Sequence, residues 1–167
     1  MTCRKLDRGR SVANHGHPRY LRSMHVAFAL FADAANLSQE GKLNILGVFD
    51  ALQVGTLPAL HPRATLVVHL KGTALDVGSH KVTLNWLSPS GNELWSSEGE
   101  LGVANPPQGV LEMDFPLIAQ LDLPLDQSGG YVMRVGLDGD TRAEVALEVR
   151  TPGVAQGMAA AAPKWVS

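Results

Sequence analysis

The chain has 167 residues, of which 45% are hydrophobic and 18% charged, and its formal net charge is −2 at pH 7. This length and apolar content predict one domain with a buried core, and the small net charge excludes a surface that attracts nucleic acid or acidic membranes as a whole. The one cysteine, Cys3, excludes a disulfide within the chain, which favours a reducing compartment and predicts a cytoplasmic protein.

Residues 1–23 are predicted to form a basic arm. The first 22 residues carry a net charge of +5, so the remainder carries −7. No apolar secretion signal follows the basic residues, and the longest apolar run, 26–32, is far shorter than the ~20 residues that cross a bilayer. We expect the arm to contact other proteins or anionic lipid headgroups, and we expect no dedicated nucleic-acid binding because aromatic residues are not interleaved with the basic ones. Its candidate partner-binding residues are Arg4, Lys5, Arg8, Arg10, Arg19, Tyr20 and Arg22.

Residues 24–150 are predicted to form an all-β domain. Apolar and polar residues alternate in several short segments, as with Val82, Leu84 and Trp86, and this period is typical of strands with one buried face. The predicted strands are 25–33, 43–50, 64–71, 80–87, 93–101, 110–117, 131–137 and 142–149. About eight short strands predict an antiparallel β-sandwich, immunoglobulin-like or related.

Turn residues separate the predicted strands. Gly41 in segment 36–42 and the segments 88–93 and 138–141 are typical of tight hairpins. The segment 120–130 is predicted to be a long connection between the sheets. Single helical turns are expected, if anywhere, within 57–63 or 116–121.

The segment 41–50, GKLNILGVFD, is predicted to be a strand that is covered on both faces. Leu43, Ile45 and Phe49 point one way and Leu46 and Val48 the other. Apolar residues on both sides indicate cover by the second sheet on one side and by a loop or a partner protein on the other.

The sequence predicts no catalytic residue, no cofactor and no metal site. The six histidines are scattered, and His15 and His17 have no further ligands near them in the sequence. There is no Gly-x-Ser-x-Gly nucleophile motif and no phosphate-binding loop. We therefore expect a protein that is not an enzyme.

A hydrolase is the least favoured alternative. It would use two carboxylates that face each other across a cleft. We expect the candidates instead to lie on the solvated faces of two strands, with Leu111 on the buried face of the second strand. The candidate carboxylates are Glu98, Glu100, Glu112 and Asp114.

A small-ligand or glycan-binding module is the other alternative. A hairpin turn at 88–92 would place Trp86 beside Leu94 and Trp95 beside Asn85. The two tryptophans are then predicted on opposite faces, with one of them at the surface, where its ring could stack on a sugar.

The segment 24–150 resembles a family of small bacterial and phage proteins that is classed as a domain of unknown function. The matching stretches are FADAA at 31–35, GKLNILGVFD at 41–50, LPALHPRATLVVHLKG at 57–72 and GSHKVTLNWLSPSG at 78–91. The resemblance implies an all-β sandwich and brings no established catalytic residue, cofactor or substrate. The basic N-terminal extension departs from the family pattern.

Residues 151–167 are predicted to be a second tail, rich in Ala, Gly and Pro, in which Lys164 and Trp165 are candidate partner-binding residues. Together these features predict an accessory or scaffolding subunit that binds a larger protein assembly through its tails. We expect it in the cytoplasm or at the cytoplasmic side of a membrane complex, such as an energy-converting or photosynthetic one.

Overall fold

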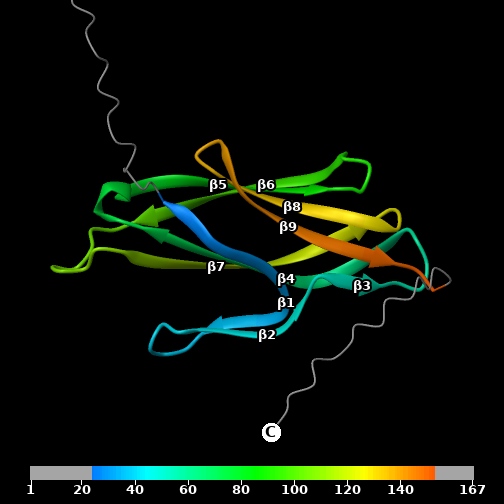
Figure 1. The fold of residues 1–167 in the computed structure, drawn as a ribbon, viewed down its shortest axis with the longest axis horizontal. Helices are drawn as coiled ribbons and strands as arrows, with labels where there is room; N and C mark the ends of the chain where they lie inside the picture. Colours follow the sequence, from blue (N-terminus) through cyan, green and yellow to red (C-terminus); the bar gives the residue numbers. More distant parts are fainter. Residues whose placement is uncertain (1–23, 153–167) are drawn as a thin grey trace, which may run out of the picture.

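A computed structural model of the protein describes residues 24–152, which form two packed β-sheets (Figure 1). Sheet A has the strand order β2-β1-β4-β7, and sheet B has the order β3-β9-β8-β5-β6. Sheet A contains β1 (His25–Leu37), β2 (Leu43–Phe49), β4 (Ala59–Gly72) and β7 (Met113–Leu125). Sheet B contains β3 (Ala51–Gln53), β5 (Gly78–Leu87), β6 (Glu93–Val103), β8 (Gly129–Leu137) and β9 (Asp140–Arg150). The predicted all-β sandwich is confirmed.

The strand order is that of an immunoglobulin-like fold. β1 pairs antiparallel with β4 in sheet A, whereas the short β3 pairs parallel with β9 in sheet B. The N-terminal part of the domain thus contributes β1 to sheet A and β3 to sheet B. The β1–β2 hairpin is an addition that projects beyond the sandwich (Figure 1).

Trp86 and Tyr131 occupy the centre of the core. Both side chains are fully buried, and their rings stack with centroids 5.1 Å apart. The indole Nε1–H of Trp86 donates to the backbone oxygen of Pro124 at 3.0 Å. The Tyr131 hydroxyl accepts from the backbone N–H groups of Asp126 and Gln127, at 2.8 and 2.9 Å. This is the tyrosine corner of immunoglobulin-like domains, and it fixes the corner between β7 and β8.

The predicted turns at 88–93 and 138–141 are confirmed. The N–H of Gly91 donates to the Ser88 oxygen at 2.8 Å, which closes a four-residue turn. Asp138 and Gly139, with φ of 53° and 91°, join β8 to β9 as a two-residue hairpin, the geometry that matches the twist of the flanking strands.

Most strands are longer than predicted, and β4 and β7 differ most from the prediction. β4 continues back through Pro62 because a bulge between His61 and Ala64 takes up the residues that break the pairing. β7 runs on through Pro124, which an edge strand tolerates because one side of it needs no ladder donor. The predicted connection between the sheets is present but confined to 126–128, between β7 and β8. The helical turns predicted at 57–63 and 116–121 were wrong, and the described residues contain only one short 3₁₀ turn, Ala74–Asp76.

β2 is an edge strand of sheet A, and no loop among the described residues covers its side with Leu46 and Val48, so that alternative was wrong, whereas cover by a partner protein stays a prediction. The side chains of Leu46 and Val48 are 72% and 61% exposed. The predicted partner-binding residues of the two tails, among them Arg4, Arg22 and Trp165, lie outside the described residues.

Candidate functional site

Three of the four stretches that carry the family resemblance meet at one cleft. It is a cavity of about 380 Å³ at the junction of β1, the end of β2, the β4 bulge and β7. Its polar lining comes from Asp33 in the FADAA stretch, from His61 and Arg63 in the HPR stretch, and from Gln120. A carboxylate, an imidazole, a guanidinium and an amide around one cavity can hydrogen-bond both donors and acceptors of a ligand.

Asp33 and Gly47 fit together at the side of this cleft. Gly47 has φ +68°, a left-handed conformation, and a Cβ at this position would overlap the Asp33 carboxylate. The backbone oxygen of Asp33 accepts from the buried Thr65 hydroxyl at 3.3 Å. The glycine in GKLNILGVFD is therefore required by the close approach of the aspartate in FADAA.

The bulge in β4 places Arg63 at the cleft. Arg63 has φ +52°, which is unfavourable for a residue with a side chain, and its N–H donates to Asp122 Oδ1 at 2.9 Å. Such strain persists only where the surroundings impose it, and it is common at functional sites. Bulges also redirect side chains near such sites.

Phe49 connects the cleft to the core. Its ring lies edge-on to His61 at 5.9 Å and stacks on Phe31 at 6.0 Å, and Phe31 in turn contacts Trp86 edge-on at 6.0 Å. The base of the projecting hairpin is thus anchored by a chain of aromatic contacts.

A second polar cluster ties the start of β1 to sheet B. The Asp76 carboxylate accepts from the N–H groups of Met24 and Thr73, both at 2.8 Å. Burial opposes ionisation of Asp76, but these hydrogen bonds outweigh it and hold its pKa below the ordinary value. The His80 ring bridges the Asp76 backbone oxygen and the Asp138 carboxylate, each at 2.7 Å.

His80 has no nitrogen left for proton transfer to a substrate. A carbonyl oxygen and a carboxylate can only accept, so both ring nitrogens donate and the imidazolium is the form that fits. The hydrogen bond to Asp138, followed by that to the Asp76 oxygen, raises the pKa of His80, and the same bond lowers the pKa of Asp138. This histidine–aspartate pair is therefore a structural clamp.

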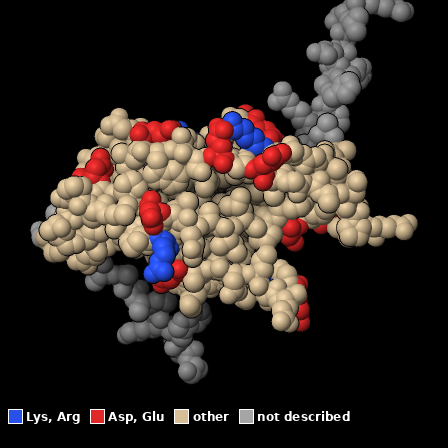
Figure 2. All heavy atoms as spheres, turned by 180° about the vertical axis from the view of Figure 1, so that it is seen from behind, with Lys and Arg blue, Asp and Glu red and all other residues tan. Residues whose placement is uncertain are grey.

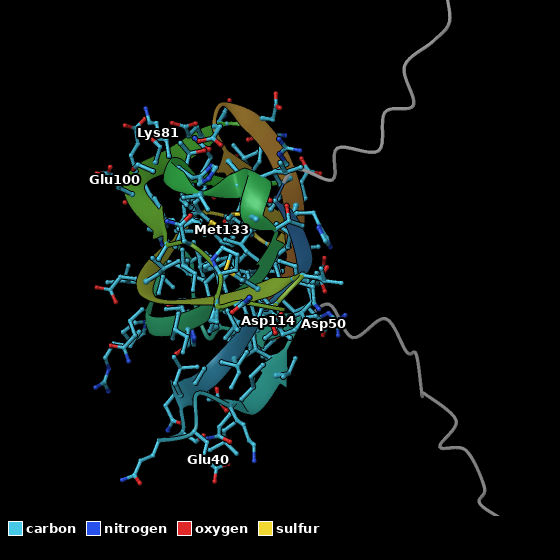
Figure 3. The ribbon with its side chains drawn as sticks, turned by 90° about the vertical axis from the view of Figure 1, so that its left-hand side faces the viewer. Glu40, Asp50, Lys81, Glu100, Asp114 and Met133 are labelled. Atoms are coloured by element: carbon cyan, nitrogen blue, oxygen red, sulfur yellow. The ribbon has the colours of Figure 1, made fainter. Side chains whose placement is uncertain are left out.

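The four carboxylates of the hydrolase alternative do not converge. Glu98 pairs with Lys81 at 2.7 Å on the outer face of sheet B, and Glu100 bonds to Ser79 beside it. Asp114 lies instead on the outer face of sheet A, as Figure 3 shows with Glu100 and Asp114 on different layers. Glu112 bonds Lys71 at 2.8 Å. Leu111, expected on a buried strand face, is 87% exposed because it precedes β7.

The two tryptophans share a face, contrary to the prediction. Leu87 pairs with Glu93 but Trp86 pairs with Trp95, because a bulge takes up Leu94. A slip of one residue moves a side chain to the other face of the sheet. Trp86 is fully buried and Trp95 packs partly buried against the core, so the expected exposed stacking patch is not formed by these residues.

Exposed apolar side chains lie at both ends of the outer face of sheet A, with the buried Ala32 between them. Phe28, Leu30 and Ala32 follow one another along this side of β1, and Val48 lies opposite Ala32 on β2. Phe28 is 37% exposed, and its ring contacts His69 with centroids 5.0 Å apart. We call this surface, from Phe28 along β1 to Leu46 and Val48 on β2, the outer apolar face.

Charged groups border the outer apolar face at the far end of β4. Lys71 lies 2.8 Å from Glu112 and 3.5 Å from Asp114, and His69 lies 3.3 Å from Asp114. Figure 2 shows, on the side of the molecule that it views, the same distribution of small mixed-charge clusters with wide uncharged areas between them. Among residues 24–152 no group of three or more His, Cys, Asp or Glu could hold a metal ion, and no helix there could span a membrane.

The model of a family of unknown function, DUF6941, matches residues 27–150. The chain belongs to this family. The match covers almost all of the described part of this DUF6941 protein and confirms the resemblance found in its sequence. No curated protein matches the chain.

Among solved structures, the DUF6941 domain is similar to the alkylpurine DNA glycosylase AlkC of Pseudomonas fluorescens, bound to DNA with an abasic site analogue. The identity is 12% and the TM-score 0.40, over 77% of this chain and 30% of that one. The chain therefore spans less than a third of the glycosylase, and a likeness of this size does not bear on function.

Proposed function

We propose that this protein is a non-enzymatic accessory subunit that binds another protein through the outer apolar face. The observation that carries the proposal is the exposure of Phe28, Leu46 and Val48 on one side of sheet A. Exposed apolar surface bordered by polar residues is typical of protein interaction sites.

The border of this face favours a protein partner over a lipid or a nucleic acid. Lys71 is engaged by two carboxylates, Glu112 and Asp114, so the border is mixed in charge and more acidic than basic. An anionic membrane or a phosphate backbone would require a basic border. An apolar centre with a polar border is the usual composition of a protein–protein interface.

The engagement of the polar side chains supports a role without catalysis. His80 donates from both nitrogens, and Asp76 accepts three hydrogen bonds, from the N–H groups of Met24 and Thr73 and from the Thr73 hydroxyl at 3.1 Å. Both groups are committed to holding strands together. The tails, with the basic arm at 1–23, would extend the contact with the partner assembly.

Site-specific photocrosslinking in the source cells tests this proposal. A photoreactive residue at Phe28 or at Val48 should crosslink the same protein, whereas one at Lys81, on the outer face of sheet B, should not. Binding of that purified protein should then be weakened at least about tenfold by Phe28→Asp, since this buries an unpaired charge. Equal crosslinking from Lys81, or unchanged affinity of Phe28→Asp, would overturn the proposal.

A second candidate function is the binding of a small polar ligand in the cleft. The strained Arg63 and its neighbours Asp33 and His61 favour it, and the cavity volume lies within the usual range for ligand sites, roughly 300–1,000 Å³. The guanidinium suits a carboxylate group on the ligand. Calorimetric titration with a panel of amino acids and small carboxylic acids should give saturable binding. Arg63→Ala should remove this binding, whereas the control Lys81→Ala should retain it. No binding across the panel would contradict this second function.

A further inference from the structure

The outermost strands of the two sheets are protected to different degrees against pairing with another chain. β6 carries Glu98 and Glu100, β7 contains two prolines, Pro116 and Pro124, and β3 is only three residues long. Charges, prolines and short length are the usual means of blocking an exposed edge. β2, with the sequence LNILGVF, has seven residues and neither a charge nor a proline.

The backbone of β2 is open to an incoming strand. The Ser38 N–H donates to the Lys42 oxygen at 2.8 Å, which closes the hairpin with β1. Hydrogen-bonding directions alternate along an antiparallel strand, so the backbone groups of Asn44 and Leu46 face β1 while those of Leu43 and Ile45 face away from it. The hairpin also projects from the sandwich, with Glu40 at its tip (Figures 1 and 3), so its free edge is accessible.

We propose that β2 pairs antiparallel with β2 of a second copy of this chain, with Leu46 on the two-fold axis. In this register Ile45 lies opposite Gly47 of the second copy, and Leu43 lies opposite Phe49 of the second copy. Lys42 then lies opposite Asp50 of the second copy, so opposite charges meet at both ends of the paired strands. Registers with the axis at Ile45 or Gly47 would place Lys42 opposite Val48 or Leu52 instead.

The assembly would join the two four-stranded sheets into one of eight strands, which is within the usual size of a sheet. The outer apolar faces of both copies would lie side by side on the same surface. Two linked binding faces raise the avidity for a partner that has two matching sites. The pairing uses the edge of β2 and does not depend on Phe28, so it can be tested separately from the proposed partner binding.

Cysteine crosslinking of the full chain tests the register. In a Cys3→Ser background, Leu46→Cys should form a covalent dimer on mild oxidation. In the proposed register the two Leu46 residues form a non-hydrogen-bonded pair, whose Cα atoms lie about 4.5 Å apart, within reach of a disulfide. Asn44→Cys lies on the same face two residues away and should not crosslink, nor should Leu111→Cys, which is highly exposed and remote from β2. Equal crosslinking at all three positions would overturn the proposal.

Charge reversal tests the pairing of Lys42 with Asp50. Sedimentation of the unmodified chain should show a concentration-dependent dimer, and Lys42→Asp should weaken it at least about tenfold by placing carboxylates opposite each other. The double variant Lys42→Asp/Asp50→Lys should restore it, while Phe28→Asp should leave it unchanged. A wild-type chain that stays monomeric, or a double variant no better than the single one, would refute the dimer.

Discussion

The Asp33 carboxylate occupies the space where Gly47 would carry a side chain. The two residues lie opposite each other on β1 and β2, between the pairs Ala32–Val48 and Ala34–Leu46. This contact places a carboxylate at the edge of the cleft and fixes the hairpin at its base. It also explains the second glycine of GKLNILGVFD, which a strand alone would not require.

We expect Gly47→Ala to lower the free energy of unfolding by about 1–3 kcal/mol, because the added Cβ meets Asp33 and the φ of +68° becomes strained. Chemical denaturation measures the loss. The double variant Asp33→Gly/Gly47→Ala should recover the part that comes from the overlap. Gly99→Ala is the matched control, since its added Cβ would meet no atom within 4 Å, and an equal loss in this control would contradict the prediction.

We expect Tyr131→Phe to destabilise the domain by about 1–3 kcal/mol, because two partly buried N–H groups lose their acceptor. These are the N–H groups of Asp126 and Gln127. Burial raises the pKa of Tyr131, so in a spectroscopic titration this phenol should lose its proton only at a pH above the usual range for tyrosine. Asp126→Ala removes one of the two acceptors of the phenol proton, the other being the Gln127 backbone oxygen at 2.8 Å, and leaves both N–H bonds. A larger loss in this control than in Tyr131→Phe would contradict the assignment.

Much of the fold could be predicted from sequence periodicity. β5 and β8 alternate cleanly because each has one face in the core around Trp86 and Tyr131. The second half of β7 was missed because Pro124 is typical of a loop, and only its position at an edge makes it compatible with a strand. The three residues of β3 are too few to give a period.

The candidate sites were harder to predict. The motif stretches identified the right segments, yet the meeting of Asp33 with His61 and Arg63 depends on the β1–β4 register and on a bulge that the sequence HPR does not specify. The positions of Trp86 and Trp95 were wrong for the same reason, since one extra residue in β6 changes the face. The apolar character of Leu46 and Val48 is evident from the sequence, but their exposure follows from the projection of the hairpin, which periodicity does not encode.

We expect the clamp between His80 and Asp138 to make stability depend on pH. The pKa of His80 is higher in the folded state than in the unfolded state. The contribution of His80 to stability is therefore fully present below its usual pKa of about 6.5 and is lost as the pH rises through the higher folded pKa. The folded state lowers the pKa of Asp138, so that contribution is present above its usual value and is lost as the pH falls through the lower one. Stability from this pair is therefore greatest in the mildly acidic range.

Urea unfolding between pH 5 and 9 measures this dependence. His80→Gln should cost about 1–2 kcal/mol near pH 6, consistent with the loss of charge-assisted hydrogen bonds on a partly exposed group. It should also flatten the fall in stability toward high pH. His61→Gln serves as the control. If the wild-type slope persisted in His80→Gln but disappeared in His61→Gln, the pH dependence would come from His61 and the prediction would be contradicted.

We expect Arg63→Gly to stabilise the domain by about 0.5–1 kcal/mol, because glycine adopts the φ of +52° without steric cost. The N–H of residue 63 would still donate to Asp122, so no backbone hydrogen bond is lost. The matched control is Arg134→Gly in β8, where the backbone is a regular strand and glycine should destabilise. Thermal unfolding of both variants measures the difference. A gain in stability on removal of Arg63, together with loss of ligand binding in the cleft, would mean that this strained residue is kept for binding; a loss of stability would show instead that the arginine side chain holds the bulge in place.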